Sequence, residues 1–175
     1  MSFFEGRKKQ LRYIIFAVLI ALTAVLQQTG IIPQLSSVPA MALVPLCVSI
    51  AMNERSMPGL MFGLLCGVLW DSSSAAGDGF FSVTLAVTGF VTGALFTFFM
   101  RKNIYSCLLV SFGALGFCNI GYWLLFVVKK GYEGAGILLW KYYLPSMIYS
   151  LVFAVIFYYL TDFIVRHTKE KQKHI

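Results

Sequence analysis

Residues 59–71 read GLMFGLLCGVLWD, and this stretch decides the fold. It places Gly59, Gly63, Gly67 and Asp71 at strict four-residue spacing inside an otherwise apolar run. Residues four apart on a helix share one face, so the spacing predicts a flat glycine face that ends in a carboxylate. In water each interior glycine costs a helix ~1 kcal/mol relative to alanine. In a bilayer small residues let helices approach closely, so the stretch predicts a membrane helix packed tightly against a neighbour.

The composition of the chain also indicates a membrane protein. Its 175 residues are 59% hydrophobic and 12% charged, whereas ordinary soluble domains are about 25% charged. No Pro-, Gly- or Ser-rich linker divides the sequence. We therefore expect an all-α integral membrane protein that forms a single polytopic domain over residues 1–175.

Apolar runs separated by polar turns predict about six transmembrane helices. The second run contains two prolines and two serines, and its continuous part, residues 40–52, would reach only ~20 Å across a ~30 Å hydrocarbon core. If this second run does not cross, five spans remain. Pro145 is expected to open the last span, because the first turn of a helix tolerates proline. The expected spans are 11–28, 35–52, 57–73, 80–100, 104–128 and 145–165.

The basic residues predict the orientation of these spans. With six spans and a cytoplasmic N-terminus, 11 of the 14 Lys and Arg residues lie on the cytoplasmic side, including basic tails at 1–12 and 166–175. The positive-inside rule therefore predicts that both termini are cytoplasmic. The net charge of +7 is then explained by anionic lipid at that face. Nucleic acid is excluded as a partner, because no basic face with interleaved aromatic residues remains outside the membrane.

Few residues are candidates for chemistry. Asp71 comes directly before a serine-rich loop, which predicts an acid at the outer membrane interface with an interfacial or capping role. A partner contact and ion or proton handling are the alternatives. Asp162 and Arg166 stand four apart and predict a local ion pair. Asn119 is expected to bond across helices. We expect no catalytic residue, metal or cofactor, because the cysteines lack CxxC spacing and both histidines lie in the C-terminal tail.

A second pair of glycines four apart occurs in the run that follows the loop. Small residues at such spacing are typical of helix contacts in membranes. We predict that the two glycine sets form a packing surface for a helix of a partner protein, and packing within the chain is the alternative. The residues of this predicted surface are Gly59, Gly63, Gly67, Gly89 and Gly93.

The same residues resemble a known family. The stretch 59–71, the small-residue loop after it and the aromatic-rich run that contains Gly89 resemble the rod shape-determining protein MreD family. The basic N-terminus, the two glutamines at 27–28 and the Leu-Pro-Ser opening of the last run at 144–146 are also similar.

This resemblance implies a function and a fold. It implies a non-catalytic component of the machinery for lateral cell-wall elongation, multi-pass in the bacterial inner membrane. The implied partners are MreC and, through it, MreB filaments, RodA and a class B penicillin-binding protein. The implied fold is similar to the S subunits of energy-coupling-factor vitamin transporters. An S subunit is the alternative function, because Ala17 and Ala21 match the small-residue contact on the first helix of such subunits. That alternative requires a pocket with several convergent polar groups.

Overall fold

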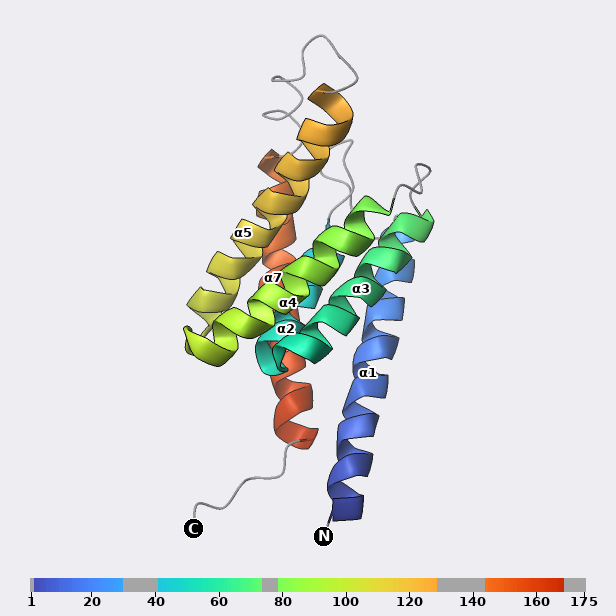
Figure 1. The fold of residues 1–175 in the computed structure, drawn as a ribbon, viewed down its shortest axis with the longest axis vertical. Coiled ribbons are helices and arrows are strands. Elements are labelled where there is room, and N and C mark those ends of the chain that lie inside the picture. Colours follow the sequence, from blue (N-terminus) through green and yellow to red (C-terminus); the bar gives the residue numbers. More distant parts are fainter. Residues whose placement is uncertain (1, 30–40, 74–78, 129–143, 169–175) are drawn as a thin grey trace.

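The computed structural model describes residues 2–29, 41–73, 79–128 and 144–168, and within these ranges the chain is helical without strands (Figure 1). This confirms the all-α class predicted from the sequence. Helix α5 continues directly into η1, a π-helical segment. The helices are α1 Ser2–Gln28, α2 Leu43–Asn53, α3 Ser56–Ser73, α4 Phe80–Phe98, α5 Ile104–Tyr122, η1 Trp123–Val128 and α7 Leu144–Thr168.

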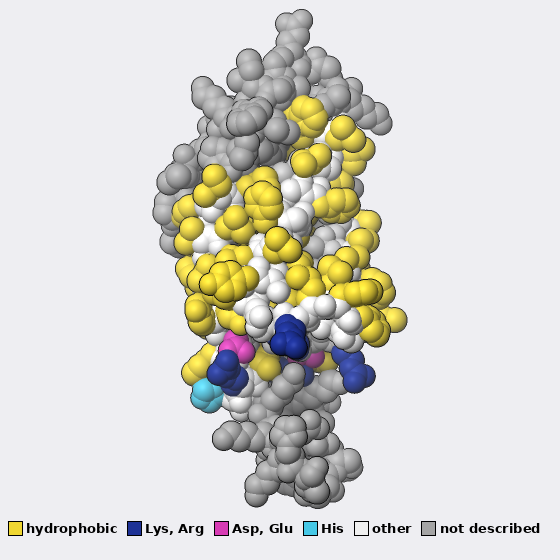
Figure 2. All heavy atoms as spheres, turned by 90° about the vertical axis from the view of Figure 1, so that its left-hand side faces the viewer, with side chains coloured by type: hydrophobic (Ala, Val, Ile, Leu, Met, Phe, Trp, Pro, Cys, Tyr) yellow, Lys and Arg dark blue, Asp and Glu magenta, His cyan; other side chains and the backbone are white. Residues whose placement is uncertain are grey.

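Four stretches are long and apolar enough to cross a membrane: Gln10–Gln28, Phe80–Phe98, Ile104–Leu125 and Ser146–Thr168. The chain is therefore a multi-pass membrane protein. Figure 2 shows hydrophobic side chains over most of one face and a band of charged side chains near one end. We call this end the basic end. Its described cations are Arg12, Arg55, Arg101, Lys102 and Arg166.

The second predicted span differs from the expectation. It forms the helix α2, which has only 11 residues, all of them buried. Helices α1, α3, α4, α5 and α7 all contact α2, so it lies inside the bundle. Its length corresponds to ~16 Å, well short of a hydrocarbon core. The predicted count of six transmembrane spans is therefore not confirmed. Helix α3 is also not among the four long apolar stretches.

The remaining helix boundaries follow local sequence signals. Pro58 lies in the first turn of α3 and Pro145 in the first turn of α7, where the missing N–H is not needed. Gly79 precedes α4 with a φ of 68°, a conformation that glycine adopts without a steric penalty. Helix α1 begins and α7 ends at the same end of the bundle (Figure 1). The part of the basic C-terminal tail from residue 169 onwards lies outside the described residues.

Candidate functional site

The glycine face of α3 packs against the backbone of α4. A Cβ added to Gly59 would lie 2.6 Å from the carbonyl oxygen of Gly89, and a Cβ on Gly89 would in turn clash with the carbonyl of Gly59. A Cβ on Gly63 would clash with the carbonyl of Leu85. The obstacles are backbone atoms, so they cannot move aside as flexible side chains can. Glycine is therefore required at the centre of this contact.

The contact continues at both ends of the two helices. A Cβ on Gly67 would clash with the backbone at Ser82, and one on Gly93 would lie 2.8 Å from the Cα of Ser56. The pair α3 and α4 has the most extensive contact among the helices of the described chain. This corrects the prediction of a surface for a partner helix, because α4 of the same chain fills it. The corrected residues are Gly59, Gly63, Gly67, Gly89 and Gly93.

Asp71 at the end of α3 caps the N-terminus of α4. Its Oδ1 accepts the N–H of Phe81 at 3.3 Å, and its Oδ2 accepts the N–H of Ser82 at 2.8 Å and the Ser82 hydroxyl at 2.5 Å. Gly79 at the N-cap position has no side chain for this task. A carboxylate also stabilises the positive end of the helix dipole. The capping role predicted for Asp71 is thus confirmed.

The two ends of the buried helix α2 are satisfied by other parts of the chain. The N–H of Leu43 donates a hydrogen bond to Oε1 of Gln27 on α1 at 3.3 Å. Just before the helix, the N–H of Met41 donates a hydrogen bond to the hydroxyl oxygen of Ser150 on α7 at 3.1 Å. Lys102 donates to the carbonyl of Asn53 at 3.4 Å, which places a cation at the negative end of the helix. Buried helix ends need such partners, because their N–H and C=O groups lack bonds within the helix.

Arg12 and Glu54 form a buried ion pair at the basic end. The distance between Arg12 Nε and Glu54 Oε1 is 2.7 Å, and the side chains are only 8% and 6% exposed. The pair joins the first part of α1 to the turn between α2 and α3. Our sequence reasoning missed it. The available signal was that Glu54 is an isolated acid in a turn predicted to lie on the same side of the membrane as Arg12.

A cavity of about 960 Å³ lies beside this ion pair. Its walls come from α1, the α2–α3 turn, the end of α4 and the residues that precede α5. The charged residues that line it are Arg12, Glu54, Arg55 and Lys102. We call it the basic cavity.

An apolar groove of about 330 Å³ lies between α4 and α5. Thr88 and Thr92 line it from α4, and Gly113, Ala114 and Phe117 line it from α5. A Cβ added to Gly113 would meet no atom within 4 Å. Gly113 in the α4–α5 groove therefore has open space beside it, in contrast to the glycines of the filled α3–α4 contact.

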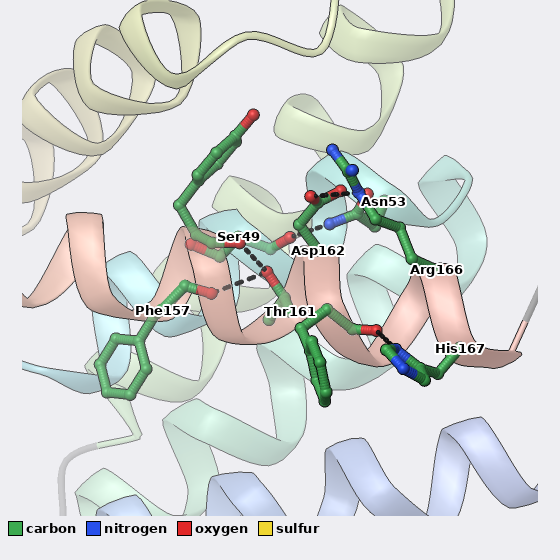
Figure 3. Close-up of polar contacts among 9 residues, drawn as sticks. Ser49, Asn53, Phe157, Thr161, Asp162, Arg166 and His167 are labelled. Carbon is green, nitrogen blue, oxygen red and sulfur yellow. Dashed lines mark hydrogen bonds and ion pairs between the residues drawn. The ribbon is translucent and has the colours of Figure 1, made fainter.

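Asp162 on α7 and Asn119 on α5 bond within their own helices. Figure 3 shows the ion pair between Asp162 Oδ2 and Arg166 Nε, 2.7 Å long, which confirms the predicted i,i+4 pair. Asn53 of α2 is drawn beside this part of α7, with which α2 is in contact. Asn119 does not bond across helices as expected. It donates to the carbonyl of Leu115 on its own helix at 2.9 Å, and its Oδ1 is buried without a partner among the described residues.

The cysteines and acids do not assemble into a metal centre in the described part of the chain. Cys47, Cys66, Cys107 and Cys118 are all buried and free. No group of three or more His, Cys, Asp or Glu side chains there is arranged to hold a metal ion.

Comparison of the chain with protein families, with curated proteins and with solved structures gave no significant match.

Proposed function

We propose that this chain is a non-catalytic scaffold subunit of the MreD type in the bacterial cytoplasmic membrane, with both termini in the cytoplasm. The observation that carries the proposal is the use of the polar side chains at the helix ends. Gln27, Asp71 and Ser150 each accept a bond from a backbone N–H outside their own helix. Polar groups used in this way build a rigid helical body. An enzyme or a transporter needs polar groups that face a substrate.

The α4–α5 groove supplies the surface on which a partner helix would dock. It is apolar, Gly113 and Ala114 are among its lining residues, and α4 and α5 contact each other much less extensively than α3 and α4 do. Small residues let helix backbones approach closely, and such packing contributes to helix association in membranes. We propose that the groove receives the transmembrane helix of an MreC-like protein. Through that protein the chain would support the work of MreB, RodA and a class B penicillin-binding protein.

The test is co-purification of the full chain with its MreC-like partner from the native host. Gly113→Leu fills the groove, and the open space around Gly113 predicts that the fold is kept. Ala21→Leu is the matched control, because Ala21 is exposed on α1, away from the groove. We expect Gly113→Leu to reduce partner recovery at least tenfold and to impair rod shape when it replaces the native protein. Ala21→Leu is expected to change neither result.

The same pair of variants separates the alternative function. An S subunit would use the small residues of α1, so Ala21→Leu would disrupt its assembly and Gly113→Leu would not. It would also bind a vitamin tightly, and a tight ligand raises the unfolding temperature by mass action. The basic cavity lies at the end of the bundle opposite to Asp71, whereas an S subunit is expected to have its vitamin pocket near Asp71. Retained rod shape on depletion, together with a large vitamin-dependent thermal shift, would refute the scaffold proposal.

A further inference from the structure

The basic cavity carries an excess of positive charge. Three cations and one carboxylate line it, namely Arg12, Arg55, Lys102 and Glu54. Glu54 offsets Arg12 through the 2.7 Å ion pair between Glu54 Oε1 and Arg12 Nε, but neither of these two buried atoms makes a hydrogen bond of regular geometry among the described residues. Arg12 is nevertheless only 7% exposed. A buried guanidinium whose Nε–H donor is not satisfied favours an anion nearby, because its planar fork fits two oxygens of one group.

The N-terminus of α3 opens on the same cavity. Ser56 and Met57 are its first two residues, and their N–H groups have no bond within a helix because they lie in its first turn. Pro58 follows and has no N–H. Both Ser56 and Met57 line the cavity. The positive end of the 18-residue helix therefore points at the same space as the three cations.

The cavity also has an apolar side. Phe98 lines it and is 76% exposed, and Met57 lines it and is 71% exposed. Figure 2 shows that the charged band adjoins the hydrophobic surface. The cavity therefore lies at the boundary between the apolar surface and the charged end, which is the level that lipid headgroups occupy.

From these three observations we propose that the basic cavity binds a phosphate-bearing anion, supplied by the headgroup of an anionic lipid or by soluble phosphate. Arg12 and the first N–H groups of α3 hold the phosphate oxygens, and Arg55 and Lys102 balance its charge. The site is independent of the α4–α5 groove, so it does not rest on the scaffold function.

The experiment measures ligand binding to the purified full chain in neutral detergent by native mass spectrometry. The probes are phosphatidylglycerol, phosphatidylcholine as the zwitterionic reference, and inorganic phosphate. The variants are Arg55→Gln and Lys102→Gln. Arg101→Gln is the matched control, because Arg101 is exposed at the same end but does not line the cavity. The unfolding temperature of each variant is measured in parallel.

We expect phosphatidylglycerol to bind more tightly than phosphatidylcholine. Each cavity variant should weaken its binding about fivefold, the ratio that corresponds to ~1 kcal/mol per cation near anionic lipid. Arg101→Gln should leave the affinity within about twofold of the native value. If inorganic phosphate binds alone with the same dependence on Arg55, the site is supported and its source is soluble phosphate. If phosphate does not bind alone, a dependence seen only with the lipid supports a headgroup site.

Two results would overturn the proposal. One is an equal loss of affinity for Arg55→Gln and Arg101→Gln, because that would indicate general surface attraction without a defined site. The other is the absence of any preference for phosphatidylglycerol over phosphatidylcholine, combined with no binding of phosphate. Arg55→Gln decides the first result, because Arg55 is exposed, and the native chain decides the second.

Discussion

Replacement of Gly63 by alanine gives the sharpest test of the α3–α4 contact. On an isolated helix this change stabilises, because alanine is favoured over glycine by ~1 kcal/mol. In this structure the added methyl would clash with the carbonyl oxygen of Leu85 and lie 2.9 Å from its carbonyl carbon and 3.1 Å from the Cα of Ala86. All three atoms belong to the backbone of α4, so the two helices must separate to admit it.

The expected magnitude follows from these distances. Ordinary van der Waals contact begins at about 3.4 Å, so the carbonyl carbon at 2.9 Å requires α4 to move by at least ~0.5 Å. Overpacking that shifts backbone costs ~1–3 kcal/mol, and the contact of two backbones places this case at the upper end. After subtraction of the gain in helix propensity, we expect Gly63→Ala to lower the free energy of unfolding by ~2 kcal/mol.

The assay is reversible unfolding of the purified protein in mixed detergent, followed by circular dichroism. Gly113→Ala is the control, since its methyl would meet no atom within 4 Å. We expect it to be neutral or to stabilise by up to ~1 kcal/mol. The free energies of unfolding of the two variants should therefore differ by ~2–3 kcal/mol, with Gly63→Ala the less stable. If Gly63→Ala stabilised the protein as much as Gly113→Ala, the packed α3–α4 contact would be refuted.

Three further changes test the bonds at the helix ends. Asp71→Ala removes three bonds to α4 and should cost ~1–2 kcal/mol, with Asp71→Asn intermediate; an unchanged thermal midpoint for Asp71→Ala would contradict the cap. Glu54→Gln leaves the buried Arg12 without its carboxylate and should lower the free energy of unfolding, measured by urea titration, by ~3–5 kcal/mol. The double variant Glu54→Gln with Arg12→Met should recover most of this stability. An additive double variant would rule out this coupling. Gln27→Ala leaves the Leu43 N–H without its acceptor and should cost ~1–3 kcal/mol, seen as faster amide exchange at Leu43. Protection equal to that of the native chain would disprove this bond.

The positions of α3, α4 and α5 could be predicted from the sequence because each of these helices is bounded by a proline, a charge cluster or a glycine. The predicted start at 80 and the end at 73 coincide with the bounds of α4 and α3. The role of Asp71 was also predictable, because an acid before a serine loop at the end of a span has water and a helix start within reach. The identity of the helix against the glycine face was not predictable. The four-residue spacing shows that the residues on one face are small, but it does not indicate which helix packs against that face.

The pair Arg12 and Glu54 and the burial of α2 escaped prediction for a related reason. Both depend on contacts between residues far apart in the chain, and neither produces a periodic pattern. A basic residue before an apolar run is typical of a membrane anchor, so Arg12 resembled its neighbours. Only the folded structure reveals that Arg12 is buried and paired with Glu54, and that five helices surround α2.

The burial of α2 links the basic cavity to the centre of the bundle. An 11-residue helix is only marginally stable alone, and Ala42 at its N-cap makes no side-chain cap bond. Its ends are therefore held from outside, by Gln27, Ser150 and Lys102. Lys102 also lines the basic cavity, and the C-cap residue Glu54 is paired with Arg12 on the cavity wall. An anion in the cavity consequently acts on the same groups that fix the C-terminal end of α2. The same side chains thus line the charged end of the molecule and hold the buried helix α2 at its apolar core.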